Sequence, residues 1–185
     1  MGRHQWSRPL RDGCSGFSQV ELLCAITVLA LAMLGFSVGL ISSLRMASAV
    51  RERALATEHA RRVIEELQDT NFAQVFALYD ATAADDPGGA GTAPGASFTV
   101  EGLTPVTDDA DGKVGEIVFP VSGSQLREDV VSHSLGMPRD LNGNGAIDAS
   151  DHAADYQLLP VLVRVRWRSQ GAPMTVELRT ILCQR

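Results

Sequence analysis

The sequence predicts an α+β fold in which a long N-terminal helix, its first half able to span a membrane, packs on a C-terminal antiparallel β-sheet. Two stretches point to the helix. No residue from Leu22 to Leu44 is charged, and residues 45–68 place apolar side chains at helical intervals. The sheet is indicated by residues 161–183, where apolar and polar side chains alternate on both sides of a glycine-containing turn.

The uncharged run is long enough to cross a bilayer core of about 30 Å as a helix. Arg3, Arg8 and Arg11 precede it against a single acid, Asp12. This positive flank predicts a cytoplasmic N-terminus, which places the rest of the chain outside the cytoplasm. We therefore expect a single-pass membrane protein with an extracytoplasmic head.

An acid, Glu21, lies at the start of this apolar segment. A carboxylate in a membrane costs about 2.5–3.5 kcal/mol on insertion scales and marks a functional position by default. It also fits an ordinary signal peptide poorly, although Ala30-Leu31-Ala32 and Ala47-Ser48-Ala49 resemble small-residue cleavage sites. The apolar run continues beyond the usual h-region of about 7 to 15 residues, which also argues against a cleaved signal peptide.

Gly16 is followed by Phe17-Ser18-Gln19-Val20-Glu21-Leu22-Leu23, after a short basic leader and before the apolar helix. This arrangement resembles the class III signal of type IV prepilins and type II secretion pseudopilins. The resemblance implies that a prepilin peptidase cuts after Gly16 and methylates Phe17. It also implies that Glu21 meets the positive amino terminus of a neighbouring pilin or pseudopilin in a filament. Ser18 stands where the family usually has threonine, and Gln19-Val20 stands where it usually has Leu-Ile.

The resemblance further implies a pilin-like fold anchored in the inner membrane. The function it predicts is that of a minor pilin or minor pseudopilin, because the chain ends in a hairpin that contains a tryptophan. The expected organisation is a leader (residues 1–16), a transmembrane and assembly helix (17–44), an amphipathic helix broken near residues 69–71 (45–79), a flexible Gly/Pro-rich loop (80–97) and a β head (98–185).

The apolar positions of the amphipathic helix are expected to face the head, and they are Val50, Ala56, Ala60, Val63, Ile64 and Leu67. The β head is expected to contain short strands at FTVEGL and GEIVFPV, residues 98–103 and 115–121. In the final hairpin, one strand turns Val161, Val163, Val165 and Trp167 to the core and Arg164, Arg166 and Arg168 to the other face. We expect this arginine row to find cross-strand partners such as Glu177.

Residues 140–151, DLNGNGAIDASD, resemble a dockerin-like calcium loop. Six oxygen ligands at EF-hand spacing are expected from Asp140, Asn142, Asn144, the Ala146 carbonyl, Asp148 and Asp151. Gly145 stands at the sixth position, and Ile147 is expected to pin the loop to an apolar surface. Asp151 replaces the bidentate glutamate of an EF-hand. The sequence therefore predicts structural, weakly bound Ca²⁺.

Composition excludes other classes of function. The net charge of −6 becomes −8 once the leader, with its three arginines and one aspartate, is removed, which argues against nucleic acid as a ligand. His59, His133 and His152 are scattered, and surface roles are expected for them rather than catalysis. The alternative function is a signal-anchored, calcium-dependent adhesin or dockerin-like module that is not assembled into a filament.

Overall fold

The computed structural model describes residues 18–184, and the chain divides after Leu44 into two compact units. The first unit contributes one described element, the N-terminal half of helix α1 (Gln19–Asp69). Every described residue of this unit is exposed, including all of its large apolar side chains. The helix is long and apolar enough to cross a membrane by length and composition.

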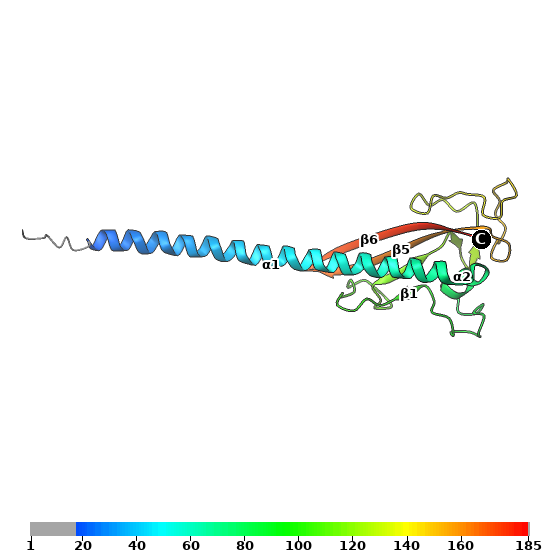
Figure 1. Cartoon of the computed structure of the whole chain (residues 1–185), viewed down its shortest axis with the longest axis horizontal. Helices are drawn as coiled ribbons and strands as arrows, with labels where there is room; N and C mark the ends of the chain where they lie inside the picture. Colours follow the sequence, from blue (N-terminus) through cyan, green and yellow to red (C-terminus); the bar gives the residue numbers. More distant parts are fainter. Residues whose placement is uncertain (1–17, 185) are drawn as a thin grey trace, which may run out of the picture. The chain divides into compact units, whose positions relative to one another are not determined.

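The second unit begins within α1, which ends at Asp69 (Figure 1). Asn71 then caps the short helix α2 (Phe72–Tyr79), because its side-chain oxygen accepts a hydrogen bond from the Ala73 amide at 3.2 Å. The helix therefore breaks where the sequence Asp69-Thr70-Asn71 predicts a break.

A four-stranded antiparallel sheet in the order β1-β2-β5-β6 forms the centre of this unit. Its strands are β1 (Ser97–Phe98), β2 (Gly115–Val118), β5 (Leu158–Ser169) and β6 (Ala172–Cys183). A separate two-stranded sheet joins β3 (Val121–Ser122) to β4 (Gln125–Leu126). The predicted α+β class, with a long apolar helix and a C-terminal antiparallel sheet, is confirmed.

The β5–β6 hairpin is paired from Leu158↔Cys183 to Ser169↔Ala172. Its two-residue turn uses Gln170 and Gly171, both with positive φ, at 51° and 91°. Positive φ at both central positions matches the right-handed twist of the flanking strands, as in a type I′ turn. The predicted hairpin is therefore present, and its turn is tight.

The core lies on the face of β5 that carries the predicted apolar residues. Val161, Val163, Val165 and Trp167 are at most 1% exposed, and they share one hydrophobic cluster with Ala56, Ala60 and Leu67 of α1. On the other face, Arg164 forms ion pairs with Glu177 at 2.8 Å and with Glu116 at 3.3 Å. The predicted orientation of the strand and the cross-strand partner Glu177 are both confirmed.

Three hydrogen bonds from two side chains join the hairpin to α1. The buried Trp167 indole donates from Nε1 to Glu52 Oε2 at 3.0 Å. At the hairpin turn, Gln170 Nε2 donates to the Arg45 carbonyl at 2.6 Å and to Ser48 Oγ at 3.3 Å. The start of this unit's helical segment is thus fixed to the end of the sheet (Figure 1).

Two local expectations are wrong. Val50, predicted to face the head, is 64% exposed, because contact with the core begins further along the helix at Ala56. FTVEGL forms a strand only up to Phe98, whose partner Gly115 is the first residue of β2. The chain then turns, since the Leu103 amide donates to the Val100 carbonyl and Gly102 has a φ of 87°.

We predict that Trp167→Phe lowers the free energy of unfolding by about 2 kcal/mol, because a hydrogen bond to a charged acceptor is lost and half-buried Glu52 is left without its donor. Urea unfolding of the full chain in detergent, followed by circular dichroism, measures this. Arg166→Ala, on the exposed face of the same strand, should change stability by less than about 0.5 kcal/mol. Equal stability of Trp167→Phe and the parent would contradict the role of this hydrogen bond.

Candidate functional site

The predicted assembly residue Glu21 lies in the first turn of α1 and is exposed. It is the one charged residue among residues 18–44. Gly16 and Phe17, the predicted processing residues, lie outside the described residues. The described part of the first unit is therefore an exposed apolar helix that bears a single carboxylate.

The other candidate site lies in the loop segment between β4 and β5. Leu126 of β4 is fully buried, and its backbone carbonyl accepts the His152 amide at 2.8 Å. Leu141, also fully buried, accepts the amides of Gln157 and Leu158 at the start of β5. These two leucines hold the segment between the small sheet and the main sheet.

Side-chain oxygens of the predicted calcium loop accept hydrogen bonds from backbone amides of the same loop. Asp140 accepts the Gly143 and Gly145 amides at 2.6 and 2.7 Å, and Asn142 accepts the Asn144 amide at 3.1 Å. In the same way Asn144 Oδ1 accepts the Ala146 amide and Asp148 Oδ1 accepts the Ser150 amide. Such short-range side-chain bonds are typical of tight Asx turns.

The last predicted calcium ligand points elsewhere. Asp151 Oδ1 accepts the Leu126 and Ala153 amides, both at 3.1 Å, so this oxygen is engaged with β4 and the following turn. Ile147 is 52% exposed, and the expectation that it pins the loop to an apolar surface is wrong, because buried Leu141 holds the loop instead. Calcium binding by the loop stays a prediction.

The side chain of Glu128, a residue that precedes the loop in the sequence, places its carboxylate inside the loop. Its side chain is fully buried, and Oε1 accepts the amides of Leu141 and Asn142 at 2.7 and 3.2 Å. Its other oxygen, Oε2, accepts the Asp148 amide at 3.2 Å. The loop is therefore wrapped around a buried carboxylate.

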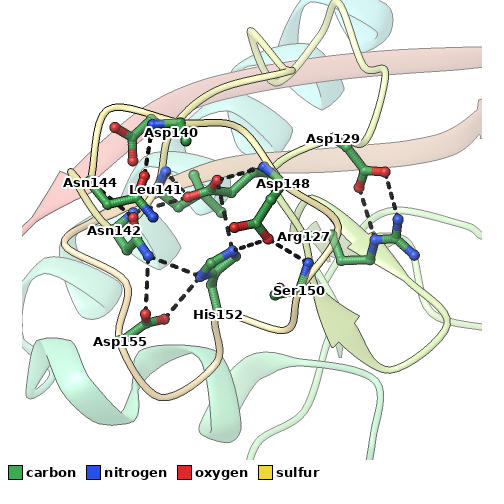
Figure 2. Close-up of polar contacts among 12 residues, drawn as sticks. Arg127, Asp129, Asp140, Leu141, Asn142, Asn144, Asp148, Ser150, His152 and Asp155 are labelled. Carbon is green, nitrogen blue, oxygen red and sulfur yellow. Dashed lines mark hydrogen bonds and ion pairs between the residues drawn. The ribbon is translucent and has the colours of Figure 1, made fainter.

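His152 faces the Glu128 carboxylate, and we call Glu128, Asp148, His152 and Asp155 the acid–histidine cluster. Figure 2 labels His152 with Asp148 and Asp155 on either side of its ring. Nε2 of His152 lies 3.3 Å from Asp148 Oδ1 and 3.7 Å from Glu128 Oε2. Its Nδ1 lies 3.1 Å from Asp155 Oδ1 and 3.4 Å from Asn142 Nδ2. Both ring nitrogens therefore face polar partners.

The charges of the cluster influence one another. Burial acts to lower the pKa of His152, but the hydrogen bond to Asp155 and the negative charge of Glu128 outweigh it, so the pKa lies above its usual value. Hydrogen bonds from Ser150 lower the pKa of Asp148, and one from Asn142 lowers the pKa of Asp155. The lowered pKa values favour ionised Asp148 and Asp155, and the raised pKa of His152 favours its protonated ring.

The surface role expected for His152 is wrong, since this residue is 3% exposed. Its position directly after the predicted calcium loop was a signal that could have pointed to the site. Glu128 was missed because it lies in the charged run Arg127-Glu128-Asp129, where nothing in the sequence distinguishes it from its neighbours. Of the predicted ligands, the structure brings Asp148 into the cluster and turns Asp151 away.

Tyr156 ties the end of this segment to α2. Its hydroxyl donates to the Phe72 carbonyl at 2.5 Å and accepts the Phe76 amide at 3.5 Å, and its ring lies 4.9 Å from the Phe72 ring. Burial raises the pKa of Tyr156 above 10.0, against the opposing effect of the Phe76 amide. The folded state therefore favours the neutral phenol.

We predict an alkaline instability that depends on Tyr156. Because its pKa is raised on folding, its contribution is complete below pH 10 and is lost as the pH rises beyond that value. Urea unfolding between pH 8 and 11 should show a steeper loss of stability in the parent than in Tyr156→Phe, which at pH 8 should cost about 1 kcal/mol. Tyr79 also has a raised pKa and would add to the same loss of stability, so both proteins are compared in the Tyr79→Phe background. Parallel pH profiles for parent and Tyr156→Phe would contradict the prediction.

Among the residues that the structure describes, Glu128, Asp148 and His152 are the group of His, Cys, Asp or Glu side chains close enough together to hold a metal ion. Their ligand atoms all lie within 4.8 Å of one another. The second candidate feature is Glu21 on the uncovered helix. The chain matches no protein-family model, no curated protein and no solved structure.

Proposed function

We propose that this chain is a minor pilin or minor pseudopilin, a structural subunit of a type IV pilus or type II secretion filament. It is anchored in the inner membrane by α1, with residues 45–185 outside the cytoplasm. The observation that carries the proposal is an apolar helix without a buried side chain in residues 18–44, bearing the single carboxylate Glu21 in its first turn. Apolar surface of this extent requires a membrane or a protein partner.

A filament subunit meets both environments, a membrane and protein partners. In the membrane the helix is surrounded by lipid, and in a filament core the same surface packs on the helices of other subunits. Glu21 is unfavourable alone in either environment, but pairing with the amino terminus of a neighbouring pilin compensates its charge and sets the axial register. The partners of the chain are then a prepilin peptidase and other pilins or pseudopilins.

The second unit supports a structural role rather than catalysis. Its helix and sheet bury one continuous core, and its polar contacts hold loops to that core. Such a head suits a subunit that is displayed on a filament surface. A membrane-anchored adhesin would share these features, but it gives no use to Glu21.

Processing tests the proposal first. Expressed with a prepilin peptidase, the chain should begin at N-methylated Phe17, and without the peptidase it should keep residues 1–16. Intact mass and N-terminal sequencing measure this. Gly16→Val should block cleavage, whereas Gly13→Ala, a glycine change elsewhere in the leader, should not. A start after Ala32 or Ala49 in both strains would remove Glu21 and sink the proposal.

Assembly tests the role of Glu21. Losing one partner of a buried charge pair costs about 3–5 kcal/mol, so Glu21→Gln should reduce incorporation into filaments by more than about a hundredfold. Quantitative blotting of sheared filaments against the membrane pool measures incorporation. Ser37→Ala is the matched control, because Ser37 Oγ bonds only its own helix, at the Met33 carbonyl. Normal filament incorporation of Glu21→Gln would favour simple anchoring, as in an adhesin.

A further inference from the structure

We propose that Glu128, Asp148 and His152 bind a divalent transition-metal ion of the zinc class, and that Asp155 orients the histidine. This inference is independent of the filament function. It rests on a mixed carboxylate and imidazole donor set whose three ligand atoms converge within 4.8 Å, in a place where two of the three residues are buried.

The spacing of the donors matches one ion. Zinc holds nitrogen and oxygen ligands at about 2.0–2.2 Å in tetrahedral geometry, which separates two ligand atoms by about 3.3–3.6 Å. His152 Nε2 lies 3.3 Å from Asp148 Oδ1 and 3.7 Å from Glu128 Oε2. Two of the three separations therefore lie at or near the tetrahedral value, and the third, between Asp148 and Glu128, is at most 4.8 Å.

The donors also have capacity for an ion. Glu128 Oε1 accepts two amides, but Oε2 accepts only the Asp148 amide and faces the imidazole with a second lone pair. Asp155 accepts from the Nδ1 side of the ring, and this carboxylate is itself held by Asn142 Nδ2 at 3.1 Å. A carboxylate on Nδ1 fixes the tautomer in which Nε2 is the ligand atom, as it does behind many metal-bound histidines.

Charge balance favours a cation at this place. The cluster contains three carboxylates and one imidazole, and the side chains of Glu128 and His152 are 0% and 4% exposed. Arg127, the neighbouring cation in sequence, is occupied by Asp129 through contacts of 2.6 and 2.8 Å. A buried carboxylate is tolerated when it is paired or coordinates a metal. A divalent ion bound at Nε2 would replace the ring proton of His152 and would put two positive charges where the protonated ring has one.

The donor chemistry selects the class of ion. Imidazole with carboxylates suits zinc and its neighbours in the first transition row, whereas calcium takes oxygen ligands only. Asp148 belongs both to the cluster and to the predicted calcium loop, so the two ions compete for it. The two sites can be separated by experiment, because Asp140 and Asp151 belong to the calcium set alone.

The test uses the full chain in detergent micelles, freed of metal by chelation and dialysis. We expect one equivalent of Zn²⁺ by calorimetry, an increase in melting temperature, and one equivalent of Co²⁺ with visible d–d absorption. His152→Asn and Glu128→Gln should weaken binding at least tenfold, and Asp155→Asn, which leaves the buried residues intact, about 10- to 100-fold. The controls are His133→Ala, an exposed histidine outside the cluster, and Asp151→Asn, and both should bind Zn²⁺ as the parent does.

Three results would overturn the proposal. They are the absence of Zn²⁺ and Co²⁺ binding, binding that is unchanged in Asp155→Asn and His152→Asn, and binding of Ca²⁺ alone with sensitivity to Asp140→Asn. The last result would assign the loop to calcium as its sequence predicts. Circular dichroism of each variant identifies any that fails to fold, and Asp155→Asn, at an exposed side chain, then decides the outcome.

Discussion

Burial of one face of β5 is the constraint on which the rest of the second unit depends. This strand pairs with β2 on one edge and β6 on the other, and its inward side chains contact the apolar stripe of α1. Apolar burial contributes about 25 cal/mol per Å², and the inward-facing Val161, Val163, Val165 and Trp167 are all buried, so they anchor the arrangement. β2 and β6 pair with this strand, and residues of α1 and α2 share its hydrophobic core.

The long segment before β5 is positioned by a second, smaller set of contacts. Leu126 and Leu141 are buried, and their backbone groups hold the chain on either side of the loop. Glu128 then accepts hydrogen bonds from three amides of the loop, those of Leu141, Asn142 and Asp148. Burying this carboxylate is favourable only because those amides and His152 surround it. The loop therefore gains its order from a charge that lies outside its own sequence.

The elements with strong periodicity could be predicted from the sequence. Alternation fixed the orientation of Val161 to Trp167 and of the arginine row, and the apolar run with its later helical spacing indicated α1. The acid–histidine cluster could not be predicted, because Glu128 is 24 residues from His152 and only the tertiary fold brings them together. The short strands were uncertain for a similar reason, since β1 depends on the fit of the Phe98 ring over Gly115. Helices and strands with a regular hydrophobic pattern can be predicted from the local sequence, whereas the site depends on contacts between residues that lie far apart in the chain.

The attachment of the hairpin along α1 has a mechanical consequence. Gln170 meets the helix at Arg45, Trp167 meets it at Glu52, and Ala56 to Leu67 complete the contact with the core. These contacts follow the helix in order, with β5 and β6 lying along it (Figure 1). A pull along α1 would load them together in shear instead of peeling them one at a time. The head is therefore built to stay attached when tension enters through its helix.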